Sequence, residues 1–418
     1  MSYFKDIEQY TTSFALVQDD GKNLSYLGLS STADAFASTI EKRTLIFILC
    51  TNSIESVVGY VGCLRNNIVP VLVDSELAPE LLERLIKTYE PAFIWGPRLG
   101  LAGLGLPVVH SYDTFDLVRT SYSVEVDLHP DLALLLTTSG STGSPKLVRQ
   151  SYRNIEANTN SIIEYLGILP SDRPITTLPM SYTYGLSIIN SHLVAGATIL
   201  MTNHTLMEKE FWTFLKEQKA TTFGGVPYTY QMLDRLRLFN MDLPSLRYLT
   251  QAGGKLSYEL SLKVATKARE KGIDFIVMYG QTEATARMSY LPPERAIDKC
   301  GSMGVAIPGG ELWLQDEEGN LIDEAEVTGE LVYRGDNVTL GYAECKSDLS
   351  LGDERGGVLI TGDMAKRDSD GFYYIVGRKK RFVKIFGSRV NLDETERLLL
   401  DQGYVCACTG IDDRMSVY

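Results

Sequence analysis

The ten residues from Thr137 to Lys146 have side chains suited to phosphate binding, because nearly all carry a hydroxyl group or only a hydrogen. Glycines let the backbone turn several N–H groups toward one point, and a concave row of N–H groups binds anions. The stretch is not a Walker A loop, because Gly-Lys-Ser/Thr is missing after the spacer. Its position between an apolar strand and a helix disfavours a plain Gly/Ser linker. The residues expected to hold phosphate are Thr138, Ser139, Gly140, Ser141, Thr142, Gly143 and Lys146.

The sequence Thr-Ser-Gly-Ser-Thr-Gly-x-Pro-Lys at residues 138–146 resembles the phosphate loop of the adenylate-forming (AMP-binding) superfamily. That superfamily contains acyl- and aryl-CoA synthetases, adenylation domains and luciferases. Further motifs follow in the family's order as far as Arg389, so the resemblance covers most of the chain. It implies ATP-dependent activation of a carboxylic acid as an acyl-adenylate, with release of pyrophosphate. Transfer to a thiol follows, either of coenzyme A or of a carrier-protein phosphopantetheine.

A second motif, Tyr279-Gly280-Gln281-Thr282-Glu283, follows an apolar run and is close to the family's Tyr-Gly-x-Thr-Glu. The resemblance implies that these five residues bind the nucleotide. The ring of Tyr279 suits adenine stacking, and the hydroxyl of Thr282 suits the α-phosphate. Glu283 offers an oxygen ligand to Mg²⁺, which prefers a few carboxylates together with phosphate oxygens. Taken alone, such a pentapeptide could be a strand-end turn with a surface glutamate.

Tyr182 lies in a segment, Leu178 to Gly185, that resembles the family's segment near the acyl pocket. The family often has His at the position of Tyr182, and a ring there can close the pocket and contact the carboxylate or phosphate. Core packing is the alternative role for this aromatic residue. The residues expected to act in catalysis are Thr282, Glu283, Tyr182 and Lys146. The acyl pocket itself is expected around Tyr182, Gly225 to Tyr228, Gly253 and Ala284 to Arg287.

Two later motifs complete the expected nucleotide site by resemblance. The glycine turn within Gln251 to Lys255 lies against adenine in the family, which implies that Gly253, Gly254 and Lys255 bind the nucleotide. Asp363, in Thr-Gly-Asp, matches the aspartate that accepts hydrogen bonds from the ribose hydroxyls. Arg378 matches an arginine near the ribose and phosphates, and the resemblance implies that Ile375 of the same segment also contacts the nucleotide. Simple turn chemistry for Asp363 and an exposed basic run for Arg378 are the alternatives.

Lys380 matches the family's hinge, so residues 377–381 are expected to let the C-terminal part rotate between the two half-reactions. Lys384 and Gly387 match positions that the family uses in thioester formation. Only 38 residues follow Lys380 (418 − 380 = 38), and the family's late lysine has no counterpart among them. Because that lysine contacts the substrate carboxylate and α-phosphate, we expect slow adenylate formation and a still weaker thioester step.

Alternating strand and helix patterns must position these motifs, and they predict an α/β fold with parallel sheets covered by helices. Strands are expected at Leu45–Leu49, Ile68–Val73, Ala92–Trp95, Leu132–Leu136 and Phe275–Met278, with helices at Ser30–Ile40, Ser53–Leu64 and Asn154–Tyr165. Asp74 or Ser75 is expected to cap a helix whose buried face carries Leu81, Leu82, Leu85 and Ile86. From Gly301 onward, short alternating strands at Glu311–Leu314, Gly329–Arg334 and Val358–Thr361 predict a small antiparallel sheet or barrel.

The expected architecture is therefore two α/β subdomains plus a small β-barrel, followed by a truncated α+β C-terminal domain. Residues 1–376 form the large domain, with the β-rich part at about 301–376, and residues 382–418 form the partial C-terminal domain. That last part is expected to contain a helix at Asp393–Leu400 and a buried strand at Val405–Gly410.

Composition narrows the class of protein. Lys+Arg 40 against Asp+Glu 53 gives a net charge of −13, which argues against a nucleic-acid partner. No apolar run approaches the roughly 20 residues that span a bilayer, and the first residues lack the apolar core of a secretory signal. The 6 cysteines and 4 histidines show no zinc pattern. Free thiols in a reducing cytosol are the plain interpretation, so a cytoplasmic location is expected.

Three functions remain open on the sequence. The first is an acid–CoA ligase, and the second is an adenylation module that loads a carrier protein. These two differ only in the second step, which the motifs do not distinguish. The third is a degenerate nucleotide-binding protein without turnover, or one completed by a partner chain. The sequence names neither the acid nor the oligomeric state.

Overall fold

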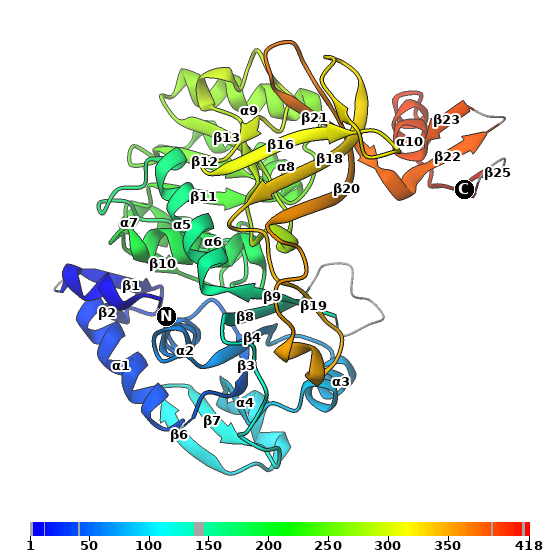
Figure 1. Cartoon of the computed structure of the whole chain (residues 1–418). Coiled ribbons are helices and arrows are strands. Elements are labelled where there is room, and N and C mark those ends of the chain that lie inside the picture. Colours follow the sequence, from blue (N-terminus) through cyan, green and yellow to red (C-terminus); the bar gives the residue numbers. More distant parts are fainter. Residues whose placement is uncertain (1–2, 12, 41, 138–145, 386–387, 412–413) are drawn as a thin grey trace.

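The computed structural model describes residues 3–11, 13–40, 42–137, 146–385, 388–411 and 414–418. The first subdomain is built on an eight-stranded sheet with the order β19-β9-β8-β4-β3-β5-β7-β6 (Figure 1). Its strands are β3 (Leu45–Cys50), β4 (Val69–Asp74), β5 (Phe93–Pro97), β6 (Val108–Tyr112), β7 (Phe115–Arg119), β8 (Leu132–Thr137), β9 (Leu147–Ser151) and β19 (Gly341–Ala343). The four central strands are parallel, as predicted. The strands toward both edges are antiparallel.

Helices cover both faces of this sheet, because its central strands are apolar on both sides. In β3, Ile46 and Ile48 belong to the same core cluster as Val57 and Val61 of α2. Phe47 faces the other core, which contains residues of α3. The helices of this subdomain are α1 (Tyr26–Ser38), α2 (Ile54–Arg65), α3 (Pro79–Tyr89) and the short α4 (Arg98–Leu101). The two helices predicted from the sequence here are thus confirmed, with α1 starting four residues earlier than expected.

The predicted cap of α3 is wrong. Asp74 ends strand β4, and its carboxylate accepts a hydrogen bond from the N–H of Glu76 at 2.9 Å. The helix begins at Pro79 after Ala78, without a side-chain cap, because proline at the first turn needs no N–H partner. Leu81 is exposed rather than packed, while Leu85 is buried.

The second subdomain contains two sheets joined by isolated bridges at Pro174 and Ile175. One has the order β10-β1-β2 and the other β11-β12-β13-β14-β15. The strands are β1 (Phe14–Gln18), β2 (Asn23–Ser25), β10 (Ile199–Met201), β11 (Thr222–Gly225), β12 (Tyr248–Gln251), β13 (Asp274–Tyr279), β14 (Ser289–Tyr290) and β15 (Val305–Ala306). The helices are α5 (Tyr152–Leu166), α6 (Thr183–Val194), α7 (Lys209–Glu217), α8 (Pro227–Arg235) and α9 (Tyr258–Glu270). Strands β11, β12 and β13 are parallel.

The third part is a five-stranded antiparallel sheet with the order β17-β16-β18-β20-β21. Its strands are β16 (Gly310–Gln315), β17 (Leu321–Ile322), β18 (Thr328–Gly335), β20 (Val358–Arg367) and β21 (Tyr373–Arg378). The antiparallel pairing is as predicted. Of the two predicted forms, sheet or barrel, the described strands form the open sheet, because the two-residue β17 and the six-residue β21 are its edges and do not pair with each other.

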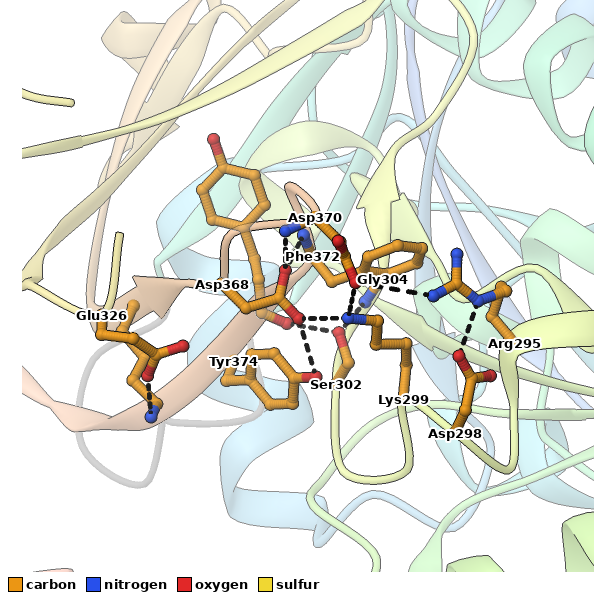
Figure 2. A network of polar contacts seen from close by, with 12 residues as sticks. Arg295, Asp298, Lys299, Ser302, Gly304, Glu326, Asp368, Asp370, Phe372 and Tyr374 are labelled. Atoms are coloured by element: carbon orange, nitrogen blue, oxygen red, sulfur yellow. Dashed lines mark hydrogen bonds and ion pairs between the residues drawn. The ribbon is translucent and has the colours of Figure 1, made fainter. Parts of the chain in front are cut away.

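An ion-pair cluster attaches this sheet to the second subdomain (Figure 2). Lys299, in the loop after β14, lies 2.9 Å from Asp368 and also pairs with Asp370, both in the turn between β20 and β21. Its side chain is only 12% exposed, so the pair is shielded from water more than a surface pair would be. Nearby, the hydroxyl of Ser302 donates to the carbonyl of Tyr373 at 2.7 Å. These contacts fix the position of the strand that leads to Arg378.

The C-terminal segment projects from the end of β21 (Figure 1). It contains β22 (Phe382–Ile385), β23 (Ser388–Asn391), α10 (Leu392–Asp401), β24 (Cys408–Ile411) and β25 (Arg414–Val417). The helix is as predicted, but the expected buried strand is shorter and mostly exposed. Val405 is 90% exposed and precedes β24, whereas Cys408 is buried. Among the described residues, no helix is long and apolar enough to cross a bilayer.

Candidate active site

The carboxylate of Asp363 is the centre of one cluster of predicted site residues. Its Oδ2 accepts hydrogen bonds from the hydroxyl of Tyr279 and from Gln281 Nε2, the latter at 2.9 Å. Its Oδ1 lies 2.8 Å from Arg378 Nε. Burial raises the pKa of the Asp363 carboxyl, against the opposing effects of the Tyr279 hydrogen bond and the Arg378 charge. Three motifs far apart in sequence thus meet at one carboxylate.

Strand pairing explains this convergence. Asp363 lies within β20, directly opposite Arg378 of β21, so it is not simply a turn residue. Tyr279 ends β13, and Gln281 Nε2 also reaches the carbonyl of Thr361 at 3.1 Å. Only 2% of Asp363 is exposed, whereas the side chain of Arg378 is 62% exposed. The cluster therefore has a buried acceptor and an exposed cation at its edge.

The glycine turn after β12 forms a second group of site residues. Gly253 has φ +78°, and a Cβ there would lie 2.6 Å from the hydroxyl of Tyr182, so both the conformation and the space require glycine. Gln251 Nε2 donates to the carbonyl of Gly254 at 2.9 Å and stabilises the turn. Lys255 Nζ reaches the carbonyl of Ile375 at 3.1 Å. The turn is thereby tied to β21 on one side and to Tyr182 on the other.

Tyr182 directly precedes α6, and its phenol lies against the glycine turn. Burial raises the pKa of the Tyr182 phenol, and the nearby charge of Arg287 opposes that shift. The ring of Tyr184 lies edge-on at 6.3 Å between centroids. The predicted position of Tyr182 beside both the nucleotide turn and the interior of the subdomain is compatible with closing an acyl pocket.

The residues after Tyr279 make a tight turn that leaves no room for a side chain at Gly280. A Cβ there would lie 1.7 Å from the carbonyl oxygen of Ala286. Thr282 and Glu283 follow on a short 3-10 helix, Thr282–Ala284. The backbone carbonyl of Glu283 accepts hydrogen bonds from Thr339 N–H at 3.0 Å and from Arg355 Nη1 at 2.9 Å. The backbone under the Glu283 carboxylate is thus held in place.

Tyr342, which no sequence motif indicated, links Glu283 to Lys146. Its hydroxyl donates to Glu283 Oε1 at 2.7 Å, and Lys146 Nζ lies 3.5 Å from the centroid of its ring. Lys146 also lies 3.5 Å from a carboxylate oxygen of Glu344. Strand β19 carries Tyr342 and pairs with β9, which begins one residue after Lys146. Burial, with Glu283 as a further cause, raises the pKa of Tyr342 to about 12, so its hydroxyl keeps its proton.

These residues fit a nucleotide and a magnesium ion by their chemistry. Glu283 presents one carboxylate beside the turn that bears Thr282, and Mg²⁺ is commonly held by one or two carboxylates together with substrate phosphates. Among the described residues there is no cluster of three or more acidic, cysteine or histidine ligands. Such an ion would therefore need phosphate oxygens as further ligands.

Several predicted residues lie outside the described part of the chain. These are Thr138, Ser139, Gly140, Ser141, Thr142, Gly143 and Gly387. Strand β8 ends at Thr137 and β9 begins at Leu147, so the predicted phosphate loop joins two antiparallel strands. The helix α5 then starts at Tyr152, directly after β9. Strand β9 was not predicted, since its residues Arg149 and Gln150 are polar although both are buried.

The fold and the order of these motifs are those of the adenylate-forming class. The chain belongs to the AMP-binding enzyme family, whose model matches residues 4–343. It is 31% identical over 284 residues to 2-succinylbenzoate–CoA ligase of Bacillus pumilus, a match that covers 67% of this chain and 56% of the relative. It is 32% identical over 306 residues to oxalate–CoA ligase of Arabidopsis thaliana, covering 72% and 58%. The matches thus span less than two thirds of these two relatives.

A solved structure shows the same fold over almost the whole chain. O-succinylbenzoate coenzyme A synthetase from Bacillus subtilis, in complex with AMP, has a TM-score of 0.80 to this chain at 22% identity. The alignment covers 98% of this chain and 86% of that chain. At this identity the comparison shows the fold and does not indicate the substrate.

Proposed function

We propose that this chain activates a carboxylic acid with ATP, forming an acyl-adenylate and pyrophosphate, and transfers the acyl group to the thiol of coenzyme A. The Asp363 cluster is the observation that carries the proposal. Oδ2 of this buried carboxylate accepts hydrogen bonds from Tyr279 and Gln281, and Oδ1 faces the exposed side chain of Arg378. A carboxylate has about four acceptor positions, and the Arg378 side chain is 62% exposed and can move aside, so the carboxylate is suited to accept the hydroxyls of a ribose.

The remaining predicted residues have roles in the same proposal. The phosphate loop with Lys146 would hold the outer phosphates, and Thr282 the α-phosphate. The glycine turn, with Gly253, Gly254 and Lys255, would lie against adenine. Tyr182 would close the acyl pocket. Magnesium held by Glu283 would supply positive charge to the reacting phosphate, while the chain's own residues position the reactants and neutralise charge.

The division into a large domain, a hinge at 377–381 and a partial C-terminal domain is part of this proposal. Strand β21 ends at Arg378, and the short helix Lys379–Arg381 follows before β22. Lys379 Nζ lies 2.8 Å from Glu330 Oε2 of the β-rich sheet. A hinge here would break this pair when the C-terminal part rotates. Lys384 and Gly387 would then serve in thioester formation.

A carrier protein in place of coenzyme A is the second candidate acceptor. The net charge of −13 argues against a nucleic-acid partner and does not distinguish the two thiols. All six cysteines are free, which supports the cytoplasm as the proposed compartment. Incubation with ATP, the acid and either coenzyme A or a holo carrier protein, followed by mass spectrometry of both thiols, separates the two acceptors.

The test of the proposal is ATP–pyrophosphate exchange with a panel of aryl, acyl and amino acids in the presence of Mg²⁺. We expect exchange with one class of acid. Asp363→Asn should lower the exchange about 10- to 100-fold, the value of one or two hydrogen bonds to a charged group. The control Asp336→Asn, in an exposed ion pair with Arg153, should leave it unchanged. Tight ATP binding without exchange for any acid would instead favour a nucleotide-binding homologue without turnover.

A further inference from the structure

Arg287 is a buried cation without an acidic partner among the described residues. It is 2% exposed and follows the turn that bears Glu283. Its Nη2 and Nε lie 3.0 and 3.3 Å from the hydroxyl oxygen of Ser187, and its Nη1 lies 2.9 Å from the sulfur of Met278. Its Cζ lies 3.9 Å from the centroid of the Tyr184 ring. All these partners are neutral.

This set of partners compensates the charge only in part. A guanidinium remains protonated inside proteins and has five N–H donors. A thioether is a weak acceptor, and one hydroxyl oxygen receives two of the donors. The ring face of Tyr184 adds a cation–π contact. Buried charges in proteins are normally paired, so the neutral surroundings of Arg287 are suited to receive an anion.

The guanidinium lines a small pocket inside the second subdomain. The pocket lies between α5 and α6 on one side and β11 and β12 on the other, and its wall includes Arg287, Gly224, Tyr248, Thr250, Ile188 and His192. None of its lining residues is acidic. His192 is uncharged at neutral pH, because burial lowers its pKa to about 4. The buried carboxylate of Asp172, in the same subdomain, is already paired with Arg247.

The pocket is lined by residues close to the ends of the two strands that lead into the predicted acyl and nucleotide turns. Strands β11 and β12 end at Gly225 and Gln251, and Gly224 and Thr250 of these strands line the pocket. A Cβ at Gly224 would lie 2.8 Å from the hydroxyl of Tyr184, so glycine makes room for this hydroxyl, which is hydrogen-bonded to Thr250. The ring of Tyr184 has its centroid 6.3 Å from that of Tyr182 and 3.9 Å from Arg287 Cζ. The far end of an acid whose reacting carboxylate lies near Tyr182 would therefore be close to Arg287.

We propose that Arg287 binds the far end of the substrate, and that the acid activated by this chain is a dicarboxylic acid. One carboxylate reacts with ATP, and the second pairs with the guanidinium, where a bidentate ion pair replaces water. This inference rests on the proposed function, because it assigns the substrate class to the same site. An amide or a methyl group in place of the second carboxylate leaves the buried charge unpaired, which disfavours monocarboxylic acids.

Binding of stable adenylate analogues tests this without turnover. The probes are two adenosine acylsulfamates of equal length, one ending in a carboxylate and the other in a carboxamide, measured by calorimetry. The wild-type chain should bind the carboxylate about 100-fold more tightly, the size typical of a desolvated charge pair. Arg287→Met should reduce this preference to less than about threefold. Arg287→Lys should retain part of it, and the exposed Arg269→Met should retain all of it.

The possible results separate the two proposals. Equal binding of both probes to the wild-type chain would overturn the role of Arg287 and leave the proposed function standing. Binding of neither probe would overturn the proposed function together with this inference. An Arg287→Met protein that melts like the wild type but keeps the preference would show that another group selects the anion. If Arg287→Met does not fold, the preference of the wild-type chain and its partial retention in Arg287→Lys still test whether Arg287 binds the second carboxylate.

Discussion

The hydrogen bond from Tyr342 to Glu283 gives a sharp test of the predicted magnesium ligand. Tyr342→Phe removes the hydroxyl that lies 2.7 Å from Glu283 Oε1 but keeps the ring beside Lys146. Because the raised pKa of about 12 keeps Tyr342 protonated, this hydrogen bond orients the carboxylate throughout the neutral range. Its loss lets the Glu283 side chain take other rotamers before it can bind a metal ion.

The size of the effect follows from the partners. A hydrogen bond to a charged group contributes about 1.5–3 kcal/mol, and Tyr342 is only half-buried, so the lower end applies. Outer hydrogen bonds to metal ligands typically change metal affinity about 10- to 100-fold. We therefore expect about a 10-fold loss, which corresponds to about 1.4 kcal/mol.

The assay is calorimetric titration of ATP with saturating Mg²⁺ and again with a chelator. The ratio of the two dissociation constants measures how much Mg²⁺ adds to ATP binding, and it requires no knowledge of the acid. Tyr342→Phe should lower this ratio about 10-fold, with ATP binding in the chelator changed by less than about twofold. The control Tyr373→Phe loses a buried hydroxyl that bonds to the carbonyl of Leu312 at 2.7 Å. An unchanged ratio in Tyr342→Phe, or an equal loss in Tyr373→Phe, would refute the reasoning.

Three further predictions concern stability and the turn of the second motif. Burial lowers the pKa of His192 from 6.5 to about 4, so the unfolded chain takes up a proton below pH 6.5 that the folded chain takes up only near pH 4. The free energy of unfolding, measured in urea, should therefore fall by about 3 kcal/mol as the pH is lowered from 6.5 to 4. In His192→Gln this free energy should depend less on pH, and the same pH dependence in both proteins would contradict the prediction. Gly280→Ala would place its Cβ 1.7 Å from a backbone oxygen, so we expect a lower melting temperature and ATP binding weakened at least about 10-fold. A variant with the melting temperature and ATP affinity of the wild type, both measured by calorimetry, would contradict this. Arg149→Met removes a fully buried guanidinium from an ion pair and several carbonyls, with an expected loss of about 3 kcal/mol in chemical denaturation; the exposed Arg153→Met should lose far less, and equal losses would refute the role of burial.

The predictions that held depend on local patterns. The apolar runs of β3, β4, β5 and β8 indicate buried parallel strands, because such strands are covered on both faces. The motif around Tyr279 could be recognised because its glycine and its polar residues are adjacent in sequence. The convergence of Tyr279, Asp363 and Arg378 was expected from the resemblance, whereas no local pattern pointed to their hydrogen bonds.

The predictions that failed depend on contacts outside the local pattern. Strand β9 contains buried Arg149 and Gln150, which hide it from a search for apolar alternation. Arg149 is tolerated there because its guanidinium meets Glu354 and the carbonyls of Tyr342 and Gly352. Val405 lies in the connection between α10 and β24 and is 90% exposed, although its apolar sequence suggests a buried strand.

The sequence by itself determined the family, the order of the strands and helices around the nucleotide motifs, and the residue types that phosphate, ribose and magnesium require. It could do so because these features lie in short segments with fixed backbone demands. Only the tertiary structure decided which distant groups meet: Tyr342 with Glu283, which are 59 residues apart, and Arg287 with a pocket that offers it no carboxylate. Strand pairing and helix packing create such contacts, and the spacing of the residues along the chain does not predict them.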